Sequence, residues 1–171
     1  MRGVLAIFAA AFSLFSVPSI AAFEKNPLLP DPVLTPGAVR SVDRAEICRP
    51  GYSKSVRNTS RETKEEIYRK YGVVKDHRRY KIDHLVPLSI GGADSAENLW
   101  PSPLFGGFNG RDKDRLELQL YRLVCHEGHD VRQAQNDIRT DWTAAYKKHC
   151  FAPGSCPSFM EYLERKKKPS P

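Results

Sequence analysis

One run, KIDHLVPLSIGG, constrains the fold of this chain more than any other feature. It places Asp83 and His84 at the end of a short apolar stretch, and a proline and two glycines follow before Asn98 opens a second apolar stretch. Short apolar runs separated by turn residues are typical of a β-hairpin. We therefore expect strands at about residues 79–84 and 98–100, joined across the loop that holds the glycines.

Helical periodicity and capping residues predict three helices around this hairpin, at about residues 61–71, 111–125 and 131–148. Thr59 and Glu62 form a predicted capping box before the first helix. The order of strand, loop, strand, loop and helix predicts an α+β fold with a ββα hairpin-plus-helix core and additional packing helices. The predicted buried face of the third helix is Val131, Ala134, Ile138, Trp142 and Ala145.

The two ends of the chain differ in composition from the centre. Arg2 and the apolar run that follows it, with small residues at positions 19 and 21, predict a cleaved signal peptide over 1–21. An uncleaved anchor is the alternative, but the apolar run is short for a membrane span. Prolines predict an extended or poorly ordered lead-in over 22–37. A folded domain is expected over 38–150, and 151–171 is interpreted as a basic tail.

Charge and cysteines favour an exported protein that meets a polyanion. Lys and Arg number 27 against 20 Asp and Glu, and removal of the signal takes away only Arg2. A basic exported protein suits nucleic acid, anionic lipid or acidic glycan, although modest charge also serves solubility. Four cysteines in an oxidising compartment favour two disulfides, and we expect Cys150–Cys156 around a turn-rich segment and Cys48–Cys125. A zinc site is disfavoured because there is no Cys-x-x-Cys pair.

The motif around Asp83 and His84, with its proline, paired glycines and Asn98, resembles that of the HNH endonucleases, which have a ββα-metal fold. Segments across residues 34–149 look like those of small exported bacterial proteins with an HNH-like centre. They are 34–38, 47–52, 68–72, 98–101 and 113–117. Many HNH nucleases also have zinc-binding cysteine pairs, which this chain lacks.

The resemblance implies one-metal hydrolysis of a phosphodiester bond. Asp83 is the candidate ligand for a divalent ion, most simply Mg²⁺, and His84 is the candidate general base. Asn98 would hold the hairpin and His84 in place, and Asn109 would complete the metal site, with Asp112 as the alternative ligand. Each of these residues also has an alternative, purely structural interpretation. Asp83 could form an ion pair with Lys81 or Arg79, and His84 could be structural. Asn98 could be a turn residue, and Asn109 could be an N-cap.

Arg79, Lys81, Arg111 and Lys113 are the candidate phosphate contacts. Together with these features, the resemblance implies an exported or periplasmic endonuclease of low sequence specificity, acting as a monomer on DNA or RNA without stable membrane insertion. An inhibitor or immunity protein is a further candidate partner. The first alternative is a non-catalytic module that binds nucleic acid or another polyanion, and the second is an anionic-envelope binder that uses the lysine-rich tail. His77, His126, His129 and His149 are interpreted as surface or packing residues.

Overall fold

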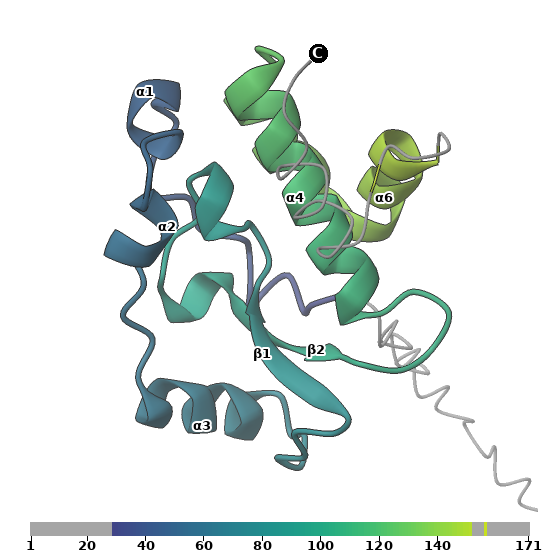
Figure 1. Cartoon of the computed structure of the whole chain (residues 1–171). Helices are drawn as coiled ribbons and strands as arrows, with labels where there is room; N and C mark the ends of the chain where they lie inside the picture. Colours follow the sequence, from purple (N-terminus) through teal and green to yellow (C-terminus); the bar gives the residue numbers. More distant parts are fainter. Residues whose placement is uncertain (1–28, 152–155, 157–171) are drawn as a thin grey trace, which may run out of the picture.

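A two-stranded antiparallel hairpin carries the Asp83–His84 pair at one end, within a mixed α/β fold (Figure 1). The computed structural model describes residues 29–151 and Cys156. The predicted signal peptide and most of the predicted basic tail lie outside these residues. In chain order the elements are α1 (Arg44–Ile47), α2 (Tyr52–Ser55), α3 (Arg61–Lys70), β1 (Tyr80–His84), η1 (Leu88–Ile90), η2 (Ala96–Asn98), β2 (Leu99–Pro103), α4 (Gly110–His126), α5 (Val131–Thr140) and α6 (Trp142–Cys150).

The hairpin agrees with the prediction for β1 to within one residue, and β2 is longer than predicted. Tyr80 pairs with Pro103, and His84 pairs with Leu99. Sequence reasoning ended the second strand before its prolines because proline lacks the N–H that a ladder needs. In a sheet of two strands each strand keeps one free edge, and such an edge tolerates proline.

The paired glycines shape the loop between the strands. Gly91 has φ +89°, and a Cβ atom there would lie 2.1 Å from the carbonyl oxygen of Ser41. A Cβ atom on Gly92 would lie 1.9 Å from the carbonyl oxygen of Val86. No side chain fits at either distance, so the loop can pack this closely against Ser41 and Val86 only with glycine at both positions.

Helix α3 lies beside the hairpin, and its cap differs from the prediction (Figure 1). The Oγ atom of Ser60, not that of Thr59, accepts the hydrogen bond from the N–H of Thr63. The Thr59 hydroxyl instead donates to the carboxylate of Asp94 in the hairpin loop. The predicted capping box of Thr59 and Glu62 is therefore wrong, because a tertiary contact takes the Thr59 hydroxyl away from the helix end.

The described part of the predicted lead-in is packed against the domain. Thr35 is buried and its hydroxyl donates to the carbonyl oxygen of Leu99 on β2. The N–H of Gly37 donates to the carbonyl oxygen of Glu97, and Val39 forms a bridge with Gly92. The fold therefore begins before residue 38, where the domain boundary was predicted.

The predicted third helix is two helices, α5 and α6, that meet at Asp141. Asp141 has an extended backbone, and its side chain accepts hydrogen bonds from the N–H groups of Thr143 and Ala144. A strong N-cap inside an apolar periodic segment ends one helix and begins the next. The predicted buried face is confirmed across both helices, with Val131, Ala134, Ile138, Trp142 and Ala145 all buried.

Both predicted disulfides are present. Cys48, directly after α1, bonds to Cys125 on α4 with a Cα–Cα distance of 5.4 Å. Cys150, at the end of α6, bonds to Cys156 with a Cα–Cα distance of 4.9 Å. They join α1 to the end of α4 and anchor the end of α6. Within the part of the chain that the structure describes, no helix is both long and apolar enough to cross a membrane.

Candidate functional site

Asp83 and His84 lie next to each other on β1 but meet different partners. Consecutive residues of a strand point to opposite faces. The Asp83 carboxylate therefore meets α4, where Lys113 lies, whereas the His84 imidazole meets the hairpin loop, where Asp94 lies. The adjacent pair thus provides two separate polar environments on the two sides of the strand.

A buried ion cluster surrounds Asp83. Its Oδ2 atom lies 3.4 Å from the Nζ atoms of both Lys81 and Lys113. Asp114 also pairs with Lys81, and Glu117 also pairs with Lys113. Lys113 is fully buried, and its ammonium also donates to the carbonyl oxygen of His84 over 2.6 Å. This last bond fixes α4 against the end of β1.

The charges within this cluster shift one another. Burial alone raises the pKa of Asp83, but Lys113 and then Lys81 outweigh burial and hold the pKa below its ordinary value. Burial raises the pKa of Glu117 to about 7, although Lys113 opposes the shift. At mildly acidic pH the ionised pair is therefore Asp83 with Lys113, and Glu117 carries a proton.

The Asp83 carboxylate still has unused ligand capacity. Its Oδ2 atom is buried without a hydrogen-bond donor among the described residues, because the two ammonium groups at 3.4 Å form ion pairs rather than aligned hydrogen bonds. Carboxylate oxygens of Asp83, Asp114 and Glu117 lie within 4.8 Å of one another. Three such oxygens form a donor set of the kind that hard divalent cations take.

On the other face, a carboxylate orients the imidazole of His84. Nε2 of His84 lies 2.6 Å from Oδ1 of Asp94. Asp94 also accepts from the Thr59 hydroxyl and from the backbone N–H of Asn58. Burial alone raises the pKa of Asp94, but these hydrogen bonds outweigh it and the pKa is lowered. An ionised Asp94 can only accept, so Nε2 of His84 carries the hydrogen.

The same geometry leaves Nδ1 of His84 as a proton acceptor. Burial lowers the pKa of His84, and although Asp94 opposes this shift the imidazole stays neutral near pH 7. With the hydrogen on Nε2, Nδ1 has a free lone pair. Nδ1 has no hydrogen-bond partner among the described residues and is not one of their buried unpaired atoms, so it retains contact with solvent. A neutral, oriented imidazole of this kind is suited to general-base chemistry.

Asn98 ties the loop to the strand end. Its Oδ1 atom accepts from the N–H of Val86, and its Nδ2 group donates to the carbonyl oxygens of Val86 and Ala93, each over 2.8 Å. Asn98 itself is fully buried. These bonds hold the chain directly after His84, so Asn98 acts on the site through the backbone.

Of the other predicted site residues, Lys81 and Lys113 lie at Asp83, whereas Asn109, Arg79 and Arg111 have other contacts. The structure places Asn109 at the N-cap of α4, where its Oδ1 atom accepts from the N–H of Arg111 and Asp112 completes a capping box. Lys113 is too deeply buried to contact a phosphate in solvent. Arg79 is exposed and lies over the ring of Phe105 at 5.1 Å, and Arg111 is exposed on the first turn of α4.

A basic cleft lies between α3 and β1. It has a volume of about 550 Å³. Among the described residues, its lining comprises four cationic side chains, two tyrosines, a histidine and an isoleucine, and no carboxylate. The lining residues are Arg61, Lys64, Tyr68, Lys75, His77, Tyr80, Lys81 and Ile82. Of the predicted phosphate contacts, Lys81 lines this cleft.

Sequence reasoning missed three carboxylates. Asp94 reads as a turn residue, and Asp114 and Glu117 read as the solvated face of a helix. The only signal for the last two was their spacing of three residues, which places them on one side of α4. Comparisons of the chain with protein-family models, curated proteins and solved structures give no match. The functional conclusion therefore depends on the geometry of these residues.

Proposed function

We propose that this protein is an exported endonuclease that hydrolyses phosphodiester bonds with a divalent cation and little sequence specificity. The observation that carries the proposal is the Asp94–His84 pair, in which an ionised carboxylate orients a neutral imidazole with a free Nδ1. Nδ1 would take a proton from the attacking water. The hairpin is followed by α4, and Asp83 on β1 contacts Lys113 on α4. This arrangement supports the proposal of a ββα-metal nuclease.

The carboxylates beside Asp83 fit a hard cation better than Asn109 does. Asp83, Asp114 and Glu117 offer oxygens that lie close together, and Oδ2 of Asp83 lacks a hydrogen-bond donor. We infer that these residues would hold Mg²⁺, displacing the partly exposed ammonium of Lys81. A bound Mg²⁺ at this site would neutralise charge that develops on the phosphate oxygens.

The test is nicking of a supercoiled plasmid by the oxidised mature protein in Mg²⁺ or in EDTA. His84→Ala and Asp94→Asn should each lower the rate by about 100-fold or more, because general bases contribute roughly that much. His126→Ala, at an exposed histidine, is the matched control. The wild-type rate should fall on the acid side, first as Glu117, whose pKa is about 7, takes a proton and weakens the Mg²⁺ site, and then as His84, whose pKa is lowered, is protonated. Cleavage that survives in EDTA or in His84→Ala would rule the proposal out.

A second candidate function is binding of nucleic acid without cleavage. The specific observations in its favour are the cationic cleft and the two lysines that already neutralise Asp83. Anisotropy of a labelled oligonucleotide in EDTA should then show binding that weakens steeply with salt. Lys64→Glu should weaken it, whereas His84→Ala should not. Binding of this kind without plasmid nicking would favour the module over the nuclease.

A further inference from the structure

Three side chains from separate segments meet at the opposite end of α4 from Asp83. His129 lies in the turn between α4 and α5, Asp137 lies on α5, and His149 lies in the last turn of α6. One ligand atom from each of them lies within 4.8 Å of the other two. The three residues lie in separate segments of the sequence, and the packing of α4, α5 and α6 brings their side chains together.

Nε2 of His129 is the unexplained atom of this cluster. It is buried and has no hydrogen-bond partner within the described part of the chain. The rings of His129 and His149 lie edge to face with their centroids 5.7 Å apart. A buried polar atom without a partner costs about 1–3 kcal/mol. His129 lies in a cluster with two other potential ligand residues, and the unpartnered nitrogen of its ring indicates that a bound species completes its coordination.

Asp137 is fixed as a carboxylate ligand should be. Its Oδ1 atom accepts from the side-chain amide of Gln133 over 2.8 Å, which is the outer contact that commonly orients a metal-ligating carboxylate. Its Oδ2 atom lies 2.8 Å from both Nε2 of His149 and Nζ of Lys148. The Lys148 side chain is 53% exposed and can turn into solvent, so it does not block this oxygen permanently.

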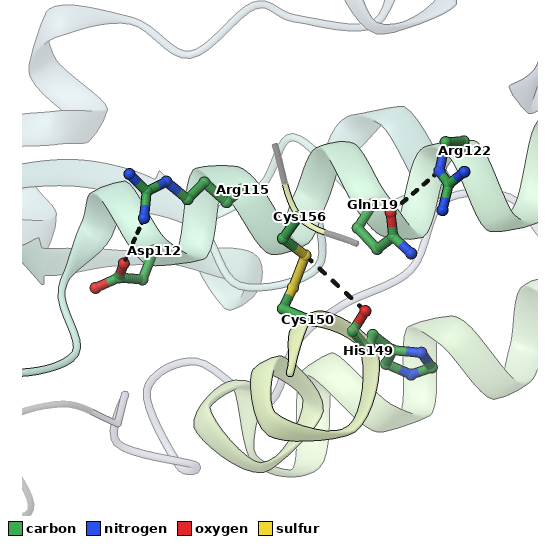
Figure 2. The surroundings of a disulfide bond; sticks show 7 residues. All are labelled: Asp112, Arg115, Gln119, Arg122, His149, Cys150 and Cys156. Atoms are coloured by element: carbon green, nitrogen blue, oxygen red, sulfur yellow. Dashed lines mark hydrogen bonds and ion pairs between the residues drawn. A yellow bond between two sulfur atoms is a disulfide. The ribbon is translucent and has the colours of Figure 1, made fainter. Parts of the chain in front are cut away.

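Backbone contacts hold both histidines in place. The N–H of His129 donates to the carbonyl oxygen of Leu123 on α4, near the Cys48–Cys125 disulfide. His149 directly precedes Cys150, and Sγ of Cys156 lies 4.0 Å from the carbonyl oxygen of His149 (Figure 2). Figure 2 shows the imidazole of His149 directed away from that disulfide. A site held from both sides loses little conformational entropy when it binds a ligand.

We propose that His129, Asp137 and His149 form a binding site for a borderline first-row divalent cation, with Zn²⁺ as the best match. Two imidazole nitrogens and one carboxylate oxygen are a common protein donor set for Zn²⁺, and water takes the fourth tetrahedral position. Mg²⁺ and Ca²⁺ prefer oxygen ligands and are selected against. When the metal binds Nε2 of His149, the hydrogen that this nitrogen shares with Asp137 is replaced by one on Nδ1, so the imidazole stays neutral. The site shares no residue with the Asp83 cluster and does not depend on nuclease activity.

The test is competition for Zn²⁺ between a chromophoric chelator and the full, oxidised mature chain without an affinity tag. One Zn²⁺ per chain should bind. His129→Gln should lower the affinity at least about tenfold, since loss of even an outer partner of a metal ligand costs roughly 10–100-fold. This variant removes no hydrogen bond of the described residues, so the fold should persist in EDTA, as circular dichroism can verify.

Controls separate this site from adventitious binding by surface histidines. His126→Gln changes an exposed histidine nearby and should leave Zn²⁺ affinity unchanged. Co²⁺ should give the strong visible absorption of a tetrahedral site in wild type and His126→Gln, and not in His129→Gln. Lys148→Gln frees Oδ2 of Asp137 and should raise the affinity several-fold. No stoichiometric Zn²⁺, equal affinity in wild type and His129→Gln, or no rise in Lys148→Gln would each overturn the proposal.

Discussion

The Asp83 cluster and the His129 cluster differ in how their polar groups are satisfied. Around Asp83, two ammonium groups lie 3.4 Å from the carboxylate, and one of them, Lys113, is fully buried. Around His129, a buried nitrogen has no partner among the described residues, and the only ammonium at the cluster there, on Lys148, is half exposed. The first cluster has a fully buried counter-ion in Lys113, whereas the counter-ion of the second, Lys148, is half exposed.

This difference bears on which cluster is ready for a metal. A cation at Asp83 must replace an ion pair within a buried cluster, whereas a cation at the second cluster displaces the half-exposed Lys148 from Asp137 and gains a His129 ring whose Nε2 has no partner among the described residues. The Asp83 cluster, which contains the motif visible in the sequence, is therefore the cluster with the greater structural role. Variants that break charge pairs should cost the most stability at Asp83 and the least at His129.

The largest expected effect is that of Lys113→Met. This change leaves the buried carboxylate of Asp83 with Lys81 as its remaining ammonium partner and removes the bond to the carbonyl oxygen of His84. Breaking a buried ion pair costs about 3–5 kcal/mol, and urea unfolding of the oxidised protein should show a loss of that size. Arg111→Met, on the exposed side of the same helix, should stay within about 0.5 kcal/mol. A loss below about 1 kcal/mol for Lys113→Met would contradict a structural role for the Asp83 cluster.

The next largest effect is the difference in lost stability between alanine variants of Asn98 and Asn109, the two asparagines that the resemblance singled out. Asn98→Ala leaves the N–H of Val86 and the carbonyl oxygens of Val86 and Ala93 without their partner. With buried groups costing about 1–3 kcal/mol each, we expect a loss of about 3 kcal/mol or more. Asn109→Ala removes an N-cap and should cost about 1 kcal/mol. Thermal unfolding of both variants measures the contrast, and equal losses would contradict it.

These asparagines also show how far the sequence could lead. The turn at the loop glycines was predictable from local backbone geometry, because Gly91 needs a positive φ. The role expected of Asn98 came from the family resemblance, and from the residues alone it was a plain turn asparagine. The role of Asn109 stayed open because an N-cap and a metal ligand require the same residue at the same place. The structure places it at the cap.

Tertiary contacts explain what the sequence could not provide. Thr59 and Ser60 satisfy the local rules for an N-cap equally well. The contact of Asp94 with the Thr59 hydroxyl leaves Ser60 as the N-cap of α3. The break at Asp141 was hidden because the apolar periodicity continues across it. Asp94 and the His129 cluster carry no local pattern, since their partners come from segments far apart in the chain.

A smaller effect should appear in the pH dependence of stability at Glu117. Its pKa in the folded protein is about 7, above the ordinary 4.5, so the folded state binds more protons between these values. The stability that this group contributes is therefore full below about pH 4.5 and is lost as pH rises through 7. Glu117→Gln should lack this loss, which we expect to be about 2 kcal/mol at most because the side chain is 23% exposed. Urea unfolding from pH 4.5 to 8 gives the difference, and parallel profiles would contradict the raised pKa.

The smallest effect should be that of His129→Gln without metal. Since Nε2 of His129 makes no hydrogen bond within the described residues, its loss should change the unfolding free energy in EDTA by no more than about 0.5 kcal/mol. With Zn²⁺ at 100 times its Kd, the wild type should gain about 2.7 kcal/mol and the variant much less. Paired urea titrations in EDTA and in Zn²⁺ measure both quantities. A large loss in EDTA would mean that His129 already has a structural partner, and the contrast with Lys113 would then disappear.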